Sequence, residues 1–592
     1  MKELMYLKPL ILFRIINALL TKSFFQADEF MQSLEPAHVK VFGYGQLTWE
    51  WQHGIRSYGF PFIFELVYYC VIFLSKLSSI IVSMAVECYH QLFIVSFPNS
   101  KLGLDMLNEM VKFPGEIETF VEYYGVWYGP KIAMAVIAAI GEFYSMLFIG
   151  KIFQRIMNKE DDKVQESESV KKIAMVLSLT NFFNCFFITR TFINSFEMAL
   201  TSAALYYWDW DGGLGIKGSD FTKSLAISIF ATFQRPTNII LWAVLGALLS
   251  LNLICKKNWS LLVYLYGKII LVSLPVCALS VAIDYSFYGE IRFPFVKFLE
   301  FNVLTPMANF YGKMPWHFHI VQSLPLLLGF TIPLFIHSFF LKSSRKFSPW
   351  FQDPLFQIRA LFVINLILCS ITTHKEFRFI YPMQPILLAF TTLDFHYWLR
   401  LYHPTDIKMS LSQLSWFFWF LPALSVFGAF MLCNFHETGT IEIMSYLHSI
   451  PSIKSVGFVM PCHSTPWQSH LHRGDIDDIW AITCEPPLHL LNSPDVGKAI
   501  DSYIDESDYL YFNTAEFFHR NFVPVSKEVP GHKLTYEWPE YLVIFEEMDK
   551  AFMHEHLKDT NYAVVKRLFN SIFHWDRRRM GDIVVYRKFP LK

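Results

Sequence analysis

Long apolar stretches recur along this chain as far as residue 434. Stretches that are long enough to cross a bilayer as a helix, about 20 residues, or that form plausible fragments of such spans, lie at 4–20, 62–84, 131–153, 172–189, 194–207, 223–234, 239–254, 260–283, 319–341, 355–373, 378–394 and 414–434. A soluble core cannot hide this much apolar surface, since 53% of the residues are hydrophobic and only 17% are charged. We therefore predict an α-helical multi-pass membrane protein with ten to twelve spans, eleven being preferred.

Lysine and arginine residues in the short connections indicate which side each connection faces. Basic connections at 151–172, 256–257, 342–346 and 400–408 are expected in the cytosol. The loop at 21–61 then faces the lumen. The first apolar segment carries Arg14 and Asn17 and has no small-residue cleavage site, so it is expected to be a retained anchor.

Hydropathy falls after Leu432, and the residues that follow are typical of a soluble domain. We divide the chain into a membrane domain, 1–434, and a lumenal α/β domain, 435–592. Strands are expected at 455–460, 479–483, 541–545 and 582–586, and a helix at 560–573. Cys462 and Cys484 are the two cysteines of this domain. In an oxidising lumen they are candidates for a disulfide that would stabilise the fold by roughly 3 kcal/mol, with free thiols as the alternative.

Several classes of function are disfavoured. The net charge is −1 and the basic residues are scattered, which argues against nucleic-acid binding. The histidines beside Cys462 lack zinc-site spacing. No internal repeat of the kind expected for transporters is found.

The loop at 21–61 concentrates carboxylates, aromatic residues and imidazole. It contains Asp28, Glu29, Glu35, His38, Trp49, Glu50, Trp51 and Arg56. Ionisable groups near a bilayer are costly and usually functional, so we expect the chemistry in this loop. The alternative is a solvated loop with aromatic residues at the headgroups.

Further polar groups flank the later apolar segments. They include Arg190, Glu197, Arg235, His374, Lys375, Glu376 and Arg378. Each taken separately could be a snorkelling helix end. Most are expected on the lumenal side, however, where they could converge with the first loop, and arginine suits phosphate because its guanidinium binds oxyanions with two hydrogen bonds. A carboxylate beside phosphate-binding cations fits an enzyme that takes a sugar from a lipid phosphate. The spacing of these residues alone supports a transporter almost as well as such a transferase.

Several of these strings resemble the signature of glycosyltransferase family 22. The blocks are Ala27-Asp28-Glu29, 32–38, 42–43, 48–51 and 55–57, followed by 190–197, 235–237 and 374–379. The resemblance implies a mannosyltransferase of the endoplasmic reticulum with a C-type glycosyltransferase fold and dolichyl phosphate mannose as donor. One departure concerns the acidic pair: where many members have His-Pro-Asp-Glu, this chain has Gln26-Ala27-Asp28-Glu29, so a role for the preceding histidine or proline is not carried over.

The C-terminal domain resembles one branch of that family. Residues 460–466, Ser469-His470 and 484–487 are similar to the lumenal tail of members that add the third mannose of the glycosylphosphatidylinositol anchor. This implies α-1,2 transfer to the second mannose of an anchor precursor. The alternatives are a family member that acts on dolichol-linked oligosaccharide and, less favoured, a lipid transporter or scramblase.

The resemblance also implies roles for the polar residues. Transfer from a β-linked donor to an α-mannoside is an inversion, which needs a base on the acceptor hydroxyl. Asp28 is our preferred base, and Glu29 could position or replace it. The substrate-binding candidates are Trp49, Glu50, Arg56, Arg190, Glu197, Arg235, His374, Lys375, Glu376 and Arg378. We expect no metal and no cofactor, because cationic side chains can meet the phosphate. The expected partners are the lipid-linked donor, the glycolipid acceptor and membrane lipids. The sequence leaves open whether there are protein partners.

Overall fold

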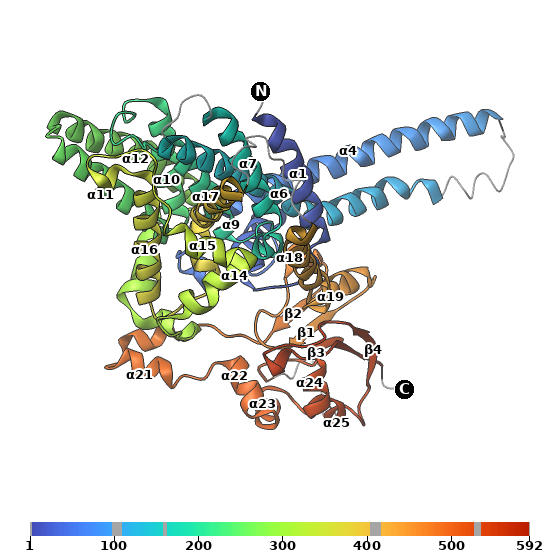
Figure 1. Ribbon diagram of the computed structural model, residues 1–592. Coiled ribbons are helices and arrows are strands. Elements are labelled where there is room, and N and C mark those ends of the chain that lie inside the picture. The colour runs from blue at the N-terminus through green and yellow to red at the C-terminus, as the bar shows by residue number, and fades with distance from the viewer. Residues whose placement is uncertain (1–2, 97–108, 158–162, 403–415, 526–533, 591–592) are drawn as a thin grey trace.

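The chain folds into a helical bundle with a smaller, sheet-containing domain below it (Figure 1). The computed structural model describes residues 3–96, 109–157, 163–402, 416–525 and 534–590. The connections at 151–172 and 400–408, which the sequence places in the cytosol, and the start of the last predicted span lie partly outside the described residues.

The membrane portion is built almost entirely of helices. Its main helices are α1 (Leu4–Leu20), α4 (Gly59–Ser96), α6 (Phe113–Ile156), α7 (Lys163–Leu179), α8 (Phe182–Phe187), α9 (Ile193–Tyr207), α10 (Ser219–Gln234), α11 (Ile239–Cys255), α12 (Trp259–Tyr288), α13 (Pro294–Leu299), α14 (Leu324–Leu328), α15 (Ile332–Ser338), α16 (Pro354–Ile371), α17 (Gln384–Tyr402) and α18 (Trp416–Phe435). Among the described residues, seven helical segments are long and apolar enough to cross a membrane. They include α6, α11, α12 and α16, whereas the shorter α9 and α10 are not among them. The multi-pass class is therefore confirmed, and the number eleven stays a prediction.

Local sequence explains where several helices begin and end. Pro354 opens α16, and the side chain of Asp353 accepts the N–H of Leu355 at 3.0 Å, which caps that end. Helix α12 is terminated at its C-terminal end by Gly289, whose φ of +71° suits a residue without Cβ.

Helix α6 is the centre of the bundle. Its small and apolar residues Ala138, Ala139 and Ile149 are wholly buried. Arg14 of α1 donates to Glu142 of α6 at 2.7 Å, and Ser178 of α7 donates to the same carboxylate at 2.5 Å. A buried charge is tolerated when it is paired in this way. Arg14 of the first apolar segment therefore takes part in a polar contact that joins α1, α6 and α7 inside the bundle.

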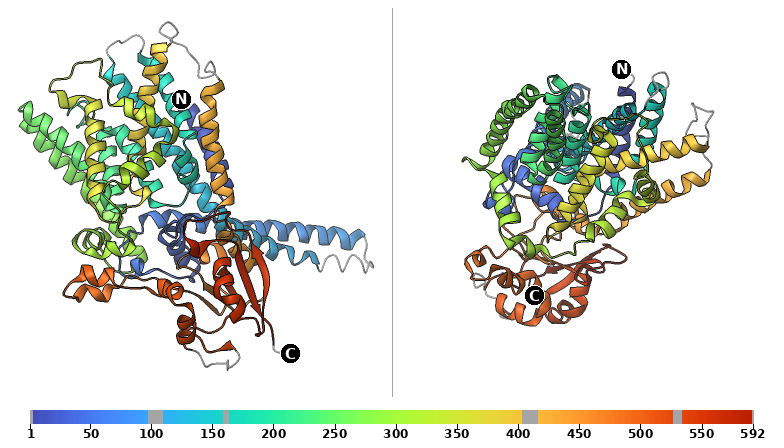
Figure 2. Two further views of the ribbon diagram at one scale, coloured as in Figure 1. Left: turned by 60° about the horizontal axis from the view of Figure 1, so that its bottom comes forward. Right: turned by 60° about the vertical axis from the view of Figure 1, so that its left-hand side comes forward.

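Helix α4 departs from the bundle. Together with the first half of α6 it forms a long hairpin that projects from the body (Figure 1) and runs crosswise to bundle helices such as α16 and α18 (Figure 2). By length and composition α4 is a candidate span, and the sequence predicts a span at 62–84. In the structure α4 is also one limb of an arm beside the bundle (Figure 1).

The first loop is folded and packed. It contains a π-helical turn, Phe30–Leu34, and the helices α2 (Glu35–Phe42) and α3 (Trp49–Gln52). Glu35 and His38 are wholly buried, and Trp51 is 2% exposed. The solvated loop that was the alternative is therefore excluded.

The C-terminal domain carries a mixed sheet. Its described strands are β1 (Ser455–Val459), β2 (Asp478–Ala481), β3 (Tyr541–Phe545), β4 (Tyr562–Leu568) and β5 (Ile583–Lys588), in the order β2-β1-β3-β5-β4. Strands β1, β2 and β3 pair in parallel, whereas β5 is antiparallel to both β3 and β4. Around the sheet lie α19 (Gly439–Ser449), α20 (Gln468–Leu471), α21 (Val496–Asp501), α22 (Glu506–Phe512), α23 (Thr514–Asn521), α24 (Glu546–Met548) and α25 (His554–His556).

The predicted helix at 560–573 is wrong, because residues 562–568 form strand β4. Val564 and Val565 are β-branched and favour a strand. Antiparallel pairing with β5, interrupted by a bulge between Val564 and Lys566, then decides the outcome. The four strands that the sequence predicts are all present.

The central strand connects the domain to the first loop. Successive side chains of a strand point to opposite faces, so Val543 and Phe545 enter one core and Leu542 and Ile544 the other. The first of these cores also contains Met31 of the first loop. The sheet therefore packs directly against the loop that carries the acidic pair.

Candidate active site

Asp28 lies in a cluster of charged side chains from opposite ends of the membrane domain. Arg378 donates through one Nη2 to Asp28 Oδ2 at 2.5 Å and to Glu376 Oε1 at 2.8 Å. Its Nε and the amide of Gln26 both donate to Glu376 Oε2 at 2.9 Å. Burial alone would raise the pKa of Glu376, but Arg378 and His374 hold that pKa well below its usual range. The side chain of Asp28 remains 29% exposed, so this carboxylate is open to a substrate.

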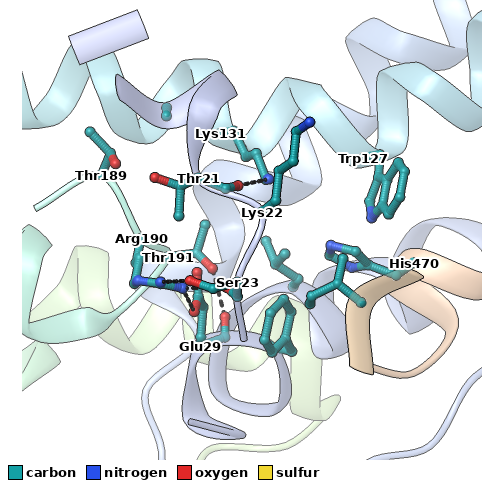
Figure 3. Close-up of a pocket in the computed structure, with 14 residues that line it drawn as sticks. Thr21, Lys22, Ser23, Glu29, Trp127, Lys131, Thr189, Arg190, Thr191 and His470 are labelled. Carbon is teal, nitrogen blue, oxygen red and sulfur yellow. Dashed lines mark hydrogen bonds and ion pairs between the residues drawn. The ribbon is translucent and has the colours of Figure 1, made fainter. Parts of the chain in front are cut away.

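Glu29 lies in different surroundings. Its carboxylate accepts a hydrogen bond from Arg190 Nη1 at 3.0 Å, and Arg190 also donates to Ser23 O at 2.7 Å, Ser23 Oγ at 2.6 Å and Phe186 O at 2.9 Å. Figure 3 shows Arg190 pointing at Glu29 and Ser23. The adjoining cavity has a volume of about 20 Å³, room for about one water molecule.

The Glu29 pair is consequently a buried link rather than an open site. The side chains of Glu29 and Arg190 are 10% and 1% exposed. Burial raises the pKa of Glu29 although Arg190 opposes the change. Because the N–H groups of Arg190 already donate to four acceptors, few of them are available to bind a phosphate.

Glu50 and Arg56 form a second open pair in the first loop. Arg56 donates to Glu50 Oε1 through Nη2 at 2.7 Å and Nε at 3.1 Å, and Gln32 donates to the other carboxylate oxygen at 3.1 Å. The guanidinium of Arg56 is also within electrostatic reach of Asp28. Trp49, the residue before Glu50, packs on Phe301 with ring centroids 4.9 Å apart.

Glu197 and Arg235 bring two more helices to the cluster. Arg235 Nε is 3.2 Å from Glu197 Oε2, and Asn238 donates to the other carboxylate oxygen at 2.8 Å. The guanidinium carbons of Arg235 and Arg378 lie 5.1 and 6.0 Å from the ring centroid of Phe379. Neither Arg235 Nε nor Glu197 Oε2 has a well-aligned hydrogen bond among the described residues. Arg235 is therefore a buried cation that is paired with Glu197 and lies over the same aromatic ring as Arg378.

His374 and Lys375 have separate roles in the geometry. His374 Nε2 lies 3.3 Å from Glu376 Oε1, so the imidazole belongs to the Asp28 cluster. Lys375 donates to Met314 O at 3.0 Å and to the carbonyl of Thr372. Its ammonium thus holds backbone rather than facing Asp28.

The C-terminal domain is fixed to the first loop by backbone donors. Glu35 accepts the N–H groups of Gln468 at 3.1 Å and Ser469 at 2.9 Å. Burial raises the pKa of Glu35 to about 7 although these donors lower it. In the same domain Cys462 and Cys484 are joined in a disulfide with their Cα atoms 5.8 Å apart.

Histidines reinforce that junction. His38 Nε2 lies 2.9 Å from His472 Nδ1, and His472 Nε2 lies 3.1 Å from Glu122 of α6. The imidazole of His472, in the C-terminal domain, therefore contacts both the first loop and the arm helix α6.

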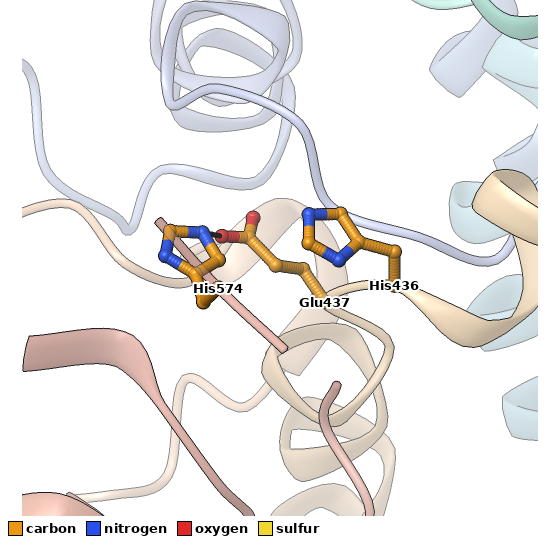
Figure 4. Close-up of side chains that lie close together, drawn as sticks. All are labelled: His436, Glu437 and His574. Carbon is orange, nitrogen blue, oxygen red and sulfur yellow. Dashed lines mark ion pairs between the residues drawn. The ribbon is translucent and has the colours of Figure 1, made fainter. Parts of the chain in front are cut away.

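His436, Glu437 and His574 bring three metal-ligating side chains together (Figure 4). His574 Nδ1 lies 2.9 Å from the backbone N and 3.0 Å from the backbone O of Asp576. Its Nε2 pairs with the carboxylate of Glu437. In the structure this trio links the end of α18 to the C-terminal domain.

Sequence reasoning gave no role to two residues near Asp28. Gln26 was noted only as a departure from the family pattern, yet its amide holds Glu376. His463 belongs to the block 460–466 that resembles the family's lumenal tail, and it lies within electrostatic reach of Asp28. The position of Gln26, two residues before Asp28, and the block around His463 are therefore usable signals.

The comparisons with known proteins agree with this architecture. A family model described as the Alg9-like mannosyltransferase family matches residues 5–472. The chain is 49% identical to GPI mannosyltransferase 3 of Eremothecium gossypii, over 100% of both chains. It is 48% identical to GPI mannosyltransferase 3 of Kluyveromyces lactis, over 98% of both chains. With GPI mannosyltransferase 3 of Saccharomyces cerevisiae it shares 47% identity over 98% of this chain and 94% of that one.

A solved structure resembles the whole chain in fold. ArnT from Cupriavidus metallidurans, bound to undecaprenyl phosphate, superposes with a TM-score of 0.51 and covers 98% of this chain and 97% of that one. The sequence identity is 10%, so the likeness concerns the fold alone. The fold is that of the C-type glycosyltransferases, as the sequence predicts.

Proposed function

Because this chain belongs to the Alg9-like mannosyltransferase family and is therefore a membrane glycosyltransferase, we propose that it adds the third mannose of the glycosylphosphatidylinositol anchor. The donor is dolichyl phosphate mannose, and the acceptor is the second mannose of an anchor precursor. The new bond is an α-1,2 linkage. The names of the full-length relatives support this choice of member.

The observation that carries the chemistry is the position of Asp28. Its carboxylate is partly exposed and lies beside the guanidinium of Arg378, with Arg56 and Arg235 nearby. A base next to several cations is the arrangement that a sugar-phosphate donor and a hydroxyl acceptor require.

In the proposed reaction Asp28 takes the proton from the acceptor hydroxyl. The hydroxyl oxygen attacks the anomeric carbon of the donor mannose from the side opposite the phosphate. The bond between that carbon and the phosphate oxygen breaks, and dolichyl phosphate leaves with the electron pair. One displacement of this kind inverts the configuration at the anomeric carbon.

Arg378 links the base to the leaving group. In the structure it bridges Asp28 and Glu376, and a donor phosphate would compete with Asp28 for the same guanidinium. Arg235, which lies with Arg378 over the ring of Phe379, would add a second positive charge near the phosphate. Preorganised cations that meet developing charge are usually the largest contribution to such catalysis.

The proposal extends to location and cofactors. We place the protein in the endoplasmic reticulum membrane with Asp28 facing the lumen, as the distribution of basic connections favours. Cationic side chains supply the charge stabilisation in this scheme, which therefore includes no metal or other cofactor.

The test is a transfer assay with purified protein in nanodiscs. The wild type should move mannose from dolichyl phosphate mannose to an anchor precursor with two mannoses, and Asp28→Asn should not. Asp477→Asn, which changes an exposed carboxylate of the C-terminal domain, is the matched control and should keep full activity. Transfer to truncated dolichol-linked oligosaccharide instead would overturn the choice of acceptor, and no transfer to either would overturn the proposed function.

A further inference from the structure

A narrow cavity lies between the first loop and the C-terminal domain. Gln46, Thr48 and Trp49 form its wall on the loop side. Residues 463–465, after β1, and 483–485, after β2, form the opposite wall. The free space is about 50 Å³, room for roughly three or four waters.

The cavity opens close to the proposed base. Met31 also lines it and lies three residues after Asp28 in the chain. On the other wall, burial lowers the pKa of His463 while the charge of Asp28 opposes that change, so the two groups lie within electrostatic reach. A ligand bound in this cavity would therefore lie on the same side of the site as Asp28, the proposed base.

Several polar groups in the cavity lack a protein partner. The hydroxyl of Thr48 is buried without a hydrogen bond. Within the part of the chain that the structure describes, the half-buried ring of His463 and the hydroxyl of Thr465 also have no hydrogen-bond partner, but unlike the Thr48 hydroxyl they are not closed off from solvent. Buried polar groups are nearly always satisfied, so the Thr48 hydroxyl needs water or a hydroxyl-bearing ligand as its partner.

The lining favours a neutral ligand rich in hydroxyl groups. Trp49 and Trp467 supply apolar faces beside these polar groups, the combination typical of pockets that bind small ligands. Among the described residues that line the cavity there is no lysine or arginine. The arginines gather instead around Asp28 and Glu376, where the donor phosphate is proposed to bind.

The wall that carries His463 is rigid. The disulfide joins the neighbouring Cys462 to Cys484, which lines the same cavity. Ser464 Oγ donates to Pro461 O at 2.5 Å, and Cys462 N donates to Ser507 Oγ at 3.2 Å. His463 itself has a left-handed backbone with φ of +51°. Such conformations persist where the surrounding structure enforces them, and they gather at functional sites.

We propose that this cavity is the acceptor-glycan subsite, in which Thr48, His463 and Thr465 hydrogen-bond the hydroxyls of a mannose-terminated glycan. The inference rests on the proposed function and assigns the acceptor side of that site to the C-terminal domain. Because the free space holds only a few waters, hydroxyl groups rather than a whole sugar ring enter it, and the ring lies at the mouth against Trp49.

The test separates acceptor from donor kinetics in nanodiscs. Thr465→Val and Thr48→Val remove a hydroxyl with little change of shape, and each should raise the KM for the acceptor about 5- to 10-fold, as expected for one lost hydrogen bond. The KM for dolichyl phosphate mannose should stay unchanged. His463→Ala should act in the same direction, and His463→Asn should restore much of the loss, because Asn tolerates a left-handed backbone and keeps a polar side chain.

His554→Ala, an exposed histidine of the same domain, is the matched control and should match the wild type. Thermal melting of each variant excludes a folding defect, and acceptor binding to Asp28→Asn measures the subsite without turnover. The subsite is overturned if the variants leave the acceptor KM unchanged, or raise both KM values equally, while the wild type transfers mannose. If the wild type transfers none, the proposed function fails instead.

Discussion

Asp28 and Glu29 follow each other in the chain, yet the two carboxylates lie in different parts of the site. Asp28 is 29% exposed and shares Arg378 with Glu376. Glu29 is 10% exposed and pairs with Arg190, which is otherwise occupied by the backbone and hydroxyl of Ser23. Successive residues of a helical turn point about 100° apart, so one acid is directed toward Arg378 and the other toward Arg190. An acidic pair in a sequence can therefore combine one chemical group with one structural group.

The largest expected effect comes from Asp28→Asn. A positioned base contributes 10²- to 10⁴-fold, so kcat should fall about 10³-fold while the melting temperature stays close to that of the wild type. Glu29→Gln should reduce activity only as far as it reduces the folded fraction. If Glu29→Gln melts normally and is as inactive as Asp28→Asn, the two carboxylates share the chemistry and the comparison fails.

Next is Arg190→Met, which leaves Glu29 buried without its cation. Breaking a buried pair costs about 3–5 kcal/mol, so melting in detergent should shift to clearly lower temperature. The double variant Arg190→Met/Glu29→Gln should recover part of that loss, because the remaining side chain is neutral. A variant that melts like the wild type but binds the donor weakly would instead make Arg190 the substrate residue that the sequence predicts.

A smaller effect is expected for Arg378→Lys on the Asp28 side. Lysine keeps the charge but loses the planar fork that contacts both Asp28 and Glu376. The KM for dolichyl phosphate mannose should rise about 10- to 100-fold, the range for a charge-assisted hydrogen bond. Steady-state kinetics at saturating acceptor measure it, and an unchanged donor KM would remove Arg378 from the phosphate site.

The smallest effect concerns Glu35, a third acid of the same loop that is buried with backbone donors and no cation. Its folded pKa, about 7, lies above the ordinary value of 4.5. The folded state therefore binds this proton more tightly, and the stabilisation is present below about pH 4.5 and is lost as the pH rises through about 7.

The pH effect of Glu35 must be measured against a neutral variant. The neighbouring His38 has its pKa lowered to about 3 and changes stability in the opposite sense below its ordinary value of 6.5. Subtracting the melting profile of Glu35→Gln from that of the wild type, between pH 4.5 and 8, isolates the carboxylate. A difference that is flat across this range would contradict the assignment.

Sequence patterns predicted the class of fold well because the relevant signals are local. Apolar length indicates membrane helices, and the drop in hydropathy after Leu432 marks the soluble part. Alternating and β-branched runs located four of the described strands. The error at 560–573 arose where a local pattern was ambiguous and pairing with β5 decided the outcome. The arm formed by α4 was also unpredictable, since composition does not specify the direction of a helix.

Residue types and their order along the chain fix the chemical groups of this protein: membrane helices, an acidic pair in the first loop and a set of arginines in later loops. The folded arrangement assigns each arginine to its acid, because Asp28 and Arg378 are 350 residues apart and Glu29 and Arg190 are 161 apart. It also decided that His463 of the C-terminal domain faces the first loop. Such pairings depend on how distant segments pack, and no periodicity along the chain encodes them.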